Sequence, residues 1–191
     1  MKSVLISIQP KWVEKIASGE KTIEVRKSRP KIETPFKCYI YCTKAEKTNT
    51  LYYMANIDLG RTAYNGKVIG EFICDKIDSR WFYISADGVP ITDIEKDFET
   101  LSCLKRKEII NYALQPNKAL KVHNGTMFIY GWHISNLKIY DKPKELGEFK
   151  SVCYEQHCKL FYDRDCDKET CSFRKIKRPP QSWCYVESLG E

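Results

Sequence analysis

The segment GEKTIEVRKSRP, residues 19–30, alternates between apolar and charged side chains directly after a glycine. Ile23 and Val25 stand two positions apart, which places both on one face of an extended strand. Glu24 and Arg26 fall on the opposite face of the same strand. The pattern therefore predicts a strand with one face packed against a core and a row of charges of both signs along the other face, where they need not be buried.

A strand and a helix are expected immediately before this segment. Residues 3–9, SVLISIQ, show the same alternation, and the run PKWVEKIAS that follows has apolar residues at helical spacing. Pro10 suits the first helical turn and Gly19 suits the C-terminal cap. Residues 37–43 predict another strand, with cysteines and an isoleucine on one face and tyrosines on the other. Further elements are expected downstream: a strand at 67–77, helices within 92–114 that begin at a Thr92–Glu95 capping box, and one long or two short strands at 126–140 closed by Pro143.

The order of these elements predicts an α+β fold. Strands and helices do not alternate regularly, and the chain has neither a G-x-G-x-x-G motif nor a phosphate-binding P-loop, which argues against a doubly wound nucleotide-binding fold. Several short strands with a few helices favour a small mixed β-barrel covered by helices. We divide the chain into one domain at residues 1–150 and a cysteine-rich C-terminal extension at residues 151–191.

The charge of the chain favours an anionic partner. The net charge is +7, from 32 basic and 25 acidic residues, and residues 1–31 hold eight basic residues against three acidic ones. Nucleic acid or a nucleotide is the expected ligand class, and a basic surface that serves only solubility is the alternative. No apolar run reaches the roughly 18 residues of a membrane span. Nine cysteines without a signal peptide predict a reduced, cytoplasmic protein.

The run SIQPKWVEKIASGEKTIEVRKSRP, residues 7–30, resembles the N-terminal signature of ASCH domains, which are relatives of the PUA RNA-binding fold. The family pattern G-x-K-x-x-E-x-R is matched at its four defined positions by Gly19, Lys21, Glu24 and Arg26. VIGEF (68–72) and YGWHISNLKIYDKP (130–143) resemble the closing strands of the family, so the resemblance covers roughly residues 3–143. It implies a PUA-like β-barrel in which the first helix and second strand line a cleft.

The chemistry of this motif suits a nucleotide, and RNA is the favoured ligand. Lys21 and Arg26 are cations that can hold phosphate, and Glu24 can accept a hydrogen bond from a base amine or a ribose hydroxyl. The other candidate binding residues, which can face the same cleft, are Ser7, Tyr39 and Tyr41. Four aromatic residues are candidates for stacking on a base, although core packing is the expected role of each: Trp12, Tyr39, Tyr41 and Trp132. A row of exposed salt bridges without any ligand remains the structural alternative.

Two other functions stay open from the sequence. The first is a small hydrolase or ribonuclease that uses Lys21 and Glu24 as catalytic residues, and the second is a protein-interaction domain. The chain resembles a subfamily that hydrolyses acetylcytidine with the motif lysine and a threonine, but Glu24 occupies the threonine position. Thr22 lies about 7 Å away along a strand, so this amidase reaction is not expected. Another relative of the family resembles a metal-assisted ribonuclease. The hydroxyl groups near the motif in this chain are compatible with such an activity.

Five of the nine cysteines fall between Cys153 and Cys184. Four thiolates can hold a zinc ion tetrahedrally, and the predicted ligands are Cys158, Cys166, Cys171 and Cys184, with His157 as a possible substitute. Some phage-type ASCH proteins look similar here, with cysteines ahead of a PPQSW ending, which is residues 179–183 in this chain. Free thiols in a reduced environment are the alternative to zinc.

Overall fold

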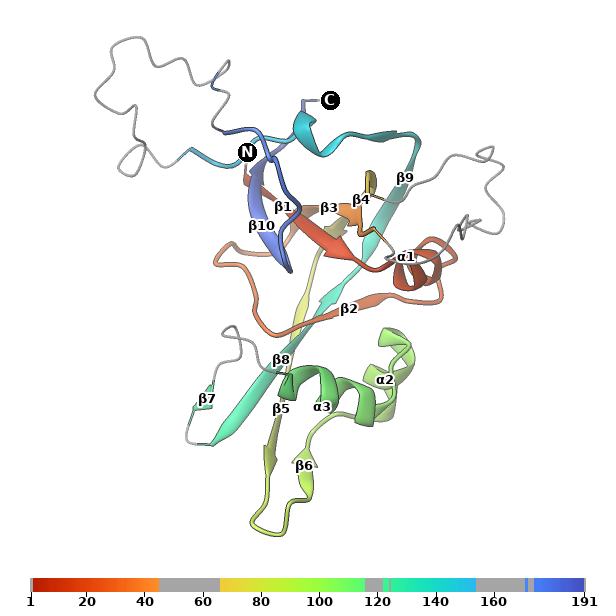
Figure 1. The fold of residues 1–191 in the computed structure, drawn as a ribbon. Coiled ribbons are helices and arrows are strands. Elements are labelled where there is room, and N and C mark those ends of the chain that lie inside the picture. The colour runs from red at the N-terminus through yellow and green to blue at the C-terminus, as the bar shows by residue number, and fades with distance from the viewer. Residues whose placement is uncertain are drawn as a thin grey trace, which may run out of the picture.

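The computed structural model describes residues 2–44, 66–115, 122–123, 125–153, 171 and 174–190 (Figure 1). The elements of the first half of this part are β1 (Lys2–Ile8), α1 (Pro10–Ala17), β2 (Ile23–Arg26), β3 (Phe36–Cys42), β4 (Val68–Cys74), β5 (Ile77–Ile84) and β6 (Pro90–Thr92). Those of the second half are α2 (Lys96–Ser102), α3 (Arg106–Leu114), β7 (Val122–His123), β8 (Thr126–His133), β9 (Ser135–Lys144), the 3-10 helix η1 (Leu146–Glu148) and β10 (Trp183–Glu187).

The described strands form two sheets. The first has the order β10-β1-β3-β4-β9, and the second has the order β2-β8-β5-β6 with β7 paired to β8. β1 and β3 are parallel, and the other pairs are antiparallel. The chain passes from one sheet to the other between β4 and β5 and between β8 and β9, as Figure 1 shows. The α+β class is confirmed, but the described strands do not close a barrel, because β10 and β9 remain the edges of one sheet and β2 and β6 those of the other.

Apolar side chains cover both faces of the first sheet. Cys38, Ile40 and Cys42 of β3 pack in one cluster with the inward side chains of β1 and α1. Tyr39 and Tyr41 pack on the opposite face with Phe149 and with residues of β1 and β10. The alternation predicted for residues 37–43 is therefore confirmed. Because β3 is buried on both faces, its nearly continuous run of apolar residues is the composition expected of such a strand.

The helical predictions are only partly correct. α1 begins at Pro10 and is followed by Gly19 at φ +79°, as expected for a glycine that ends a helix. The proposed Thr92–Glu95 capping box is wrong: Thr92 belongs to β6, and its hydroxyl donates to the Trp81 carbonyl at 2.8 Å. α2 begins only at Lys96.

Two features of the strands differ from the expectation. β5 was not predicted, because its side chains are mostly half-buried and mix apolar, polar and charged types without a clear period of two. Pro143 does not end the strands but lies within β9. The sequence 126–140 forms two strands, which was one of the two alternatives expected.

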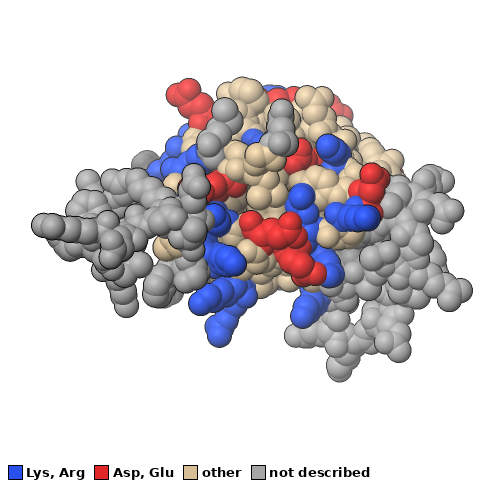
Figure 2. All heavy atoms as spheres, turned by 90° about the horizontal axis from the view of Figure 1, so that it is seen from above, with Lys and Arg blue, Asp and Glu red and all other residues tan. Residues whose placement is uncertain are grey.

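The C-terminal segment belongs to the first sheet. β10 pairs antiparallel with β1, and Leu5 stands opposite Cys184 in the register. Residues from both sides of the proposed boundary at 150 therefore share one sheet. Among the described helices, none is long and apolar enough to span a membrane. Figure 2 shows that charges of both signs are interspersed on the face seen from above, with basic side chains on either side of a central acidic group.

Candidate functional site

The charged side chains of the family motif are buried. The exposed fractions are 2% for Lys21, 4% for Glu24 and 8% for Arg26. The expectation that they lie along an open polar face is wrong, because residues of α1, α3 and the end of β1 surround that face of β2. Ile23 and Val25, on the other face, pack against α2 and α3 as predicted.

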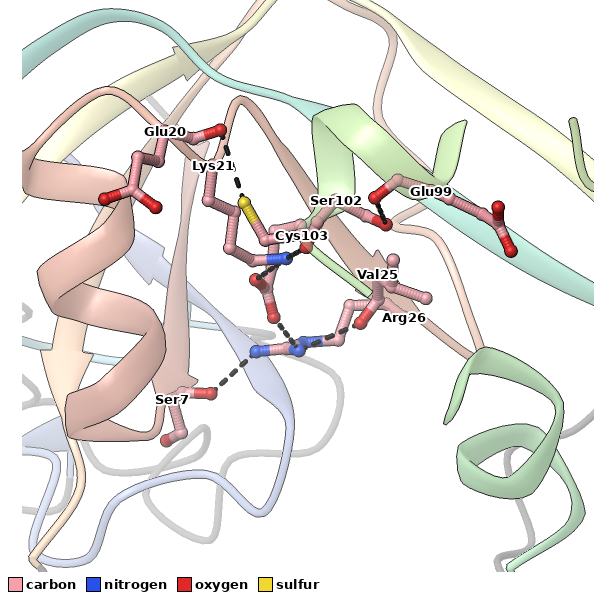
Figure 3. A network of polar contacts seen from close by, with 9 residues as sticks. Ser7, Glu20, Lys21, Val25, Arg26, Glu99, Ser102 and Cys103 are labelled. Atoms are coloured by element: carbon pink, nitrogen blue, oxygen red, sulfur yellow. Dashed lines mark hydrogen bonds and ion pairs between the residues drawn. The ribbon is translucent and has the colours of Figure 1, made fainter. Parts of the chain in front are cut away.

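Glu24 pairs with both cations. Figure 3 shows Lys21 and Arg26 in this network, together with Ser7 and Ser102. Arg26 donates through Nη1 to Glu24 Oε1 and through Nη2 to the Ser7 carbonyl at 2.7 Å. Lys21 Nζ lies 3.4 Å from Glu24 Oε2 and donates to the Ser102 carbonyl at 2.7 Å. These three side chains, which we call the ion triad, connect β2 with β1 and with the end of α2.

The ion triad keeps unused hydrogen-bonding capacity. Glu24 Oε2 and Arg26 Nε are buried and have no hydrogen-bond partner among the described residues, although Lys21 lies close enough to Glu24 Oε2 for an ion pair. Buried polar atoms are nearly always hydrogen-bonded, and leaving one unsatisfied costs roughly 1–3 kcal/mol.

Burial also changes the protonation equilibria near the ion triad. The pKa of Lys21 is lowered, mainly because burial disfavours the ammonium form, and Glu24 partly offsets this effect. The pKa of Tyr112 is raised, mainly by burial, with nearby Arg26 acting in the opposite direction. With two cations and one carboxylate, the ion triad has a formal charge of +1, which favours an anionic ligand.

A cavity of about 510 Å³ lies beside the ion triad. Ligand sites of roughly 300–1,000 Å³ are typical of proteins, so a nucleotide-sized molecule fits this volume. Aromatic, amide, hydroxyl and charged side chains share the lining, which consists of Ser7, Gln9, Lys11, Trp12, Lys21, Glu24, Val25, Arg26, Thr43, Leu104, Glu108, Tyr112, Gln115, Gln181 and Ser182. Lys21 Nζ lies 5.3 Å from the centre of the Trp12 ring, so the indole borders the ion triad directly.

The structure brings four of the predicted binding residues to this cavity and places two elsewhere. Lys21, Glu24, Arg26 and Ser7 line it, and the Ser7 hydroxyl donates to the Pro180 carbonyl at 2.6 Å. The two tyrosines that were grouped with them, Tyr39 and Tyr41, pack instead in the cluster on the other side of the first sheet. Trp132 is fully buried in the core, in the role expected for it.

Sequence reasoning missed two segments that line the cavity. Tyr112 and Gln115 come from α3 and its C-terminal end, and Gln181 comes from the segment just before β10. These residues lie about 80 or more positions from the motif, so no local spacing connects them to it. The PPQSW segment, residues 179–183, carries one signal, because it resembles the ending of some phage-type ASCH proteins, but that resemblance concerns the cysteine tail and not the cavity.

The predicted zinc ligands are only partly within the described chain. Cys158 and Cys166 lie outside the described residues, whereas Cys171 is described and Cys184 lies in β10. Burial raises the pKa of the Cys184 thiol to about 11, so deprotonation at neutral pH requires a metal or another cation nearby. No group of three or more metal-ligating side chains occurs among the residues that were described. Zinc binding remains a prediction.

The fold and the motif define an α+β protein of two sheets with a charged motif beneath the first helix. The family model of the ASCH domain matches residues 6–144, and the chain therefore belongs to the ASCH domain family. No curated protein matches the chain.

The fold is similar to that of solved ASCH structures from Zymomonas mobilis. One has a TM-score of 0.51 and 15% identity, with 97% of this chain and 87% of the other covered. For a mutant of that protein the TM-score is 0.52 at 15% identity, with coverage of 98% and 91%. A second mutant gives a TM-score of 0.51 at 16% identity, with coverage of 97% and 88%. At such low identity the similarity concerns the fold alone.

Proposed function

We propose that this protein is an RNA-binding module that receives one nucleotide of an RNA strand in the cavity beside the ion triad. The observation that carries the proposal is a nucleotide-sized cavity whose described lining includes the ion triad of Lys21, Glu24 and Arg26, with its formal charge of +1, beside aromatic side chains. Membership of the ASCH family supports it, because this PUA-like family is generally thought to bind RNA. The other ligand considered, a free nucleotide, shares the same chemistry.

Each part of the cavity has a role in this proposal. Glu24 accepts a hydrogen bond from an exocyclic amine or a ribose hydroxyl, and the surplus positive charge of Lys21 and Arg26 attracts phosphate. Trp12 and Tyr112 offer aromatic surface on which a base can stack. The glutamine side chains in the lining can both donate and accept, as the edges of bases require.

The test replaces the stacking surface and leaves the ion triad intact. Trp12→Leu should weaken binding of a fluorescein-labelled single-stranded RNA by about tenfold or more, since a stacked base contributes roughly 1–3 kcal/mol. Trp81→Leu is the matched control, because Trp81 is also half-buried but lies on β5 and does not line the cavity. Equal affinity of the two variants and the wild type, measured by fluorescence anisotropy, would contradict the proposal.

A hydrolase or ribonuclease is the second candidate function, and one observation favours it. A buried lysine with a lowered pKa beside a carboxylate is a common feature of catalytic sites. In this case the labelled RNA should be cut during incubation, and Lys21→Met should abolish cutting. If the RNA stays intact after prolonged incubation and still binds, the hydrolase or ribonuclease function is ruled out and RNA binding is the remaining function. The acetylcytidine amidase reaction is not proposed, because Thr22 does not line the cavity.

A further inference from the structure

A second cavity, of about 680 Å³, lies against the first sheet, beside the face that carries Tyr39. It is formed by β3, β4, β9 and the C-terminal end of the described chain, and its lining comprises Lys37, Tyr39, Glu71, Lys138, Ile139, Tyr140, Asp141, Lys142, Lys144, Leu189 and Gly190. None of these residues lines the cavity beside the ion triad. We call this second cavity the lysine hollow, because four of its lining residues are lysines.

Glu71, the only glutamate among the described residues that line the lysine hollow, is already paired. Lys37 Nζ lies 3.2 Å from Glu71 Oε1, and the Tyr140 hydroxyl donates to Glu71 Oε2 at 2.6 Å. Both carboxylate oxygens are thus occupied, and the charges of Lys37 and Glu71 cancel. The anchored hydroxyl also fixes the ring of Tyr140 in the hollow.

The remaining lysines leave the lysine hollow positive. Lys138 and Lys142 are exposed and have no ion pair with a described residue, and Lys144 Nζ lies 5.6 Å from the centre of the Tyr140 ring. Against these three cations the described part of the lining offers only Asp141, so the described residues carry a formal excess of two positive charges. Lys138, Tyr140, Lys142 and Lys144 follow one another along β9, whose pairing with β4 shifts register between Ile139 and Lys144, and all four line the lysine hollow.

We infer that the lysine hollow binds the phosphate backbone of single-stranded RNA. Lysine ammonium groups act as point charges that hold phosphate without reading a base, which gives binding that is insensitive to sequence and sensitive to salt. The extended row along β9 matches an extended chain of phosphates better than a single compact anion. The identity of the ligand rests on the proposed function, but the residues are different.

The test removes two phosphate contacts and measures the salt dependence of binding. Lys138→Gln combined with Lys142→Gln should weaken binding of labelled oligouridylate at low salt, and it should make the slope of log affinity against log salt shallower by about 1.4, since each lost contact on a single strand contributes roughly 0.7. The control pair, Lys96→Gln with Lys107→Gln, removes the same charge from the exposed surfaces of α2 and α3. The control slope should stay at the wild-type value.

The outcomes separate this inference from the proposed function. If Trp12→Leu lowers the affinity while the lysine pair leaves the slope unchanged, the lysine hollow is not an RNA site and the proposed function stands. If the lysine pair lowers the slope while Trp12→Leu has no effect, the lysine hollow is an RNA site and the proposed role of the cavity beside the ion triad is wrong. A fall in slope of equal size in the control pair would show a general charge effect and overturn the inference.

Discussion

Burial of two cations and one carboxylate makes Glu24 the residue on which the stability of the site depends. A buried charge without a partner is strongly unfavourable, whereas a paired and hydrogen-bonded one is tolerated. Glu24 provides the only carboxylate that pairs with Lys21 and Arg26 within the described residues. Glu24 also belongs to the lining of the cavity, so stability and the proposed ligand binding involve the same residue.

Removal of this carboxylate should destabilise the protein strongly. Glu24→Ala leaves two buried cations uncompensated, and breaking a buried pair in this way typically costs about 3–5 kcal/mol. The measurement is the free energy of unfolding from chemical denaturation, with Glu20→Ala as the control. Glu20 pairs with Lys15 at the exposed surface, and its removal should leave stability within experimental error. Equal stability of Glu24→Ala and wild type would mean that water screens the ion triad.

The lowered pKa of Lys21 predicts a dependence of stability on alkaline pH. Between this lowered pKa and the usual value of 10.5, the unfolded chain binds the proton more readily than the folded one. Stability therefore rises with pH through that window as the buried ammonium group loses its proton. Relative to Lys21→Met, the wild type should gain stability as the pH increases toward 10.5, as measured by denaturant titration at several pH values. A difference between the two proteins that stays constant with pH would contradict the burial effect.

The residue pattern predicted which side chains share a face but not whether that face is covered. The period of two along residues 22–26 correctly separated the core residues from the charged ones. Besides the nearby Ser7, the partners that bury the charges are Ser102 and the side chains of α3, which lie far from the motif in sequence. Burial of a polar face is a tertiary property, and alternation alone carries no information about it.

At the scale of elements, the segment before β10 connects the C-terminal region to the candidate site. Trp183 packs against Trp132, with ring centres 5.7 Å apart, and its Nε1 donates to the Ser28 hydroxyl at 3.1 Å. The backbone amide of Ser7 donates to the Ser182 carbonyl at 2.9 Å. These contacts hold Gln181 and Ser182 against the cavity.

Loss of this anchor should affect stability and RNA binding together. Trp183→Ala should destabilise the protein by about 3 kcal/mol, near the lower end for a tryptophan-to-alanine change because the side chain is only half-buried. It should also weaken RNA binding, since the wall that carries Gln181 loses its support. Trp183→Phe keeps an aromatic ring and should lose much less stability. Thermal denaturation and anisotropy titrations measure the two effects, and unchanged RNA affinity of the alanine variant would separate this segment from the site.

The predicted zinc site belongs to the same C-terminal region. If Cys158, Cys166, Cys171 and Cys184 bind zinc, the purified protein should carry about one zinc per chain, as for a four-thiolate site. A chelator should then lower the melting temperature, because structural zinc contributes directly to folding. Cys184→Ser should reduce the metal content, whereas Cys103→Ser, which changes a cysteine of the α2 C-terminal cap, should retain it. Elemental analysis that finds no metal in reduced, untagged protein would rule out the site.

Prediction of elements from sequence succeeded where the local signal was strong. Proline and glycine mark both ends of α1, and the alternation of residues 37–43 matches β3. The role of β10 was missed because its partner, β1, lies about 180 residues away in sequence. No local pattern indicates that a segment assigned to a cysteine-rich extension completes the sheet of the first domain.

At the scale of the whole molecule, the charge count of the N-terminal region overstates its positive surface. Three of the eight basic residues in positions 1–31, namely Lys21, Arg26 and Lys27, are buried, and the carboxylate of Glu24 pairs with two of them. Lys138, Lys142 and Lys144, which line the lysine hollow, come from β9 instead. The excess charge read from the sequence therefore indicates an anionic partner but does not locate where it binds.

Separation of the two cavities predicts that their contributions to RNA binding are independent. The cavity beside the ion triad and the lysine hollow share no lining residue among those that the structure describes. Trp12→Leu combined with the Lys138→Gln and Lys142→Gln pair should therefore lower the affinity for a long oligouridylate by the sum of the separate free-energy losses, because distant sites usually add within about 0.3–0.5 kcal/mol.

For uridine monophosphate, which occupies only one cavity, Trp12→Leu should weaken binding while the lysine pair should have no effect. Isothermal titration calorimetry with both ligands measures these losses. Weaker monophosphate binding in the lysine pair would contradict the division of roles, because the lysine hollow would then hold a single nucleotide rather than a backbone. A combined loss for the long RNA much smaller than the sum would likewise contradict independence and indicate that the two cavities are coupled.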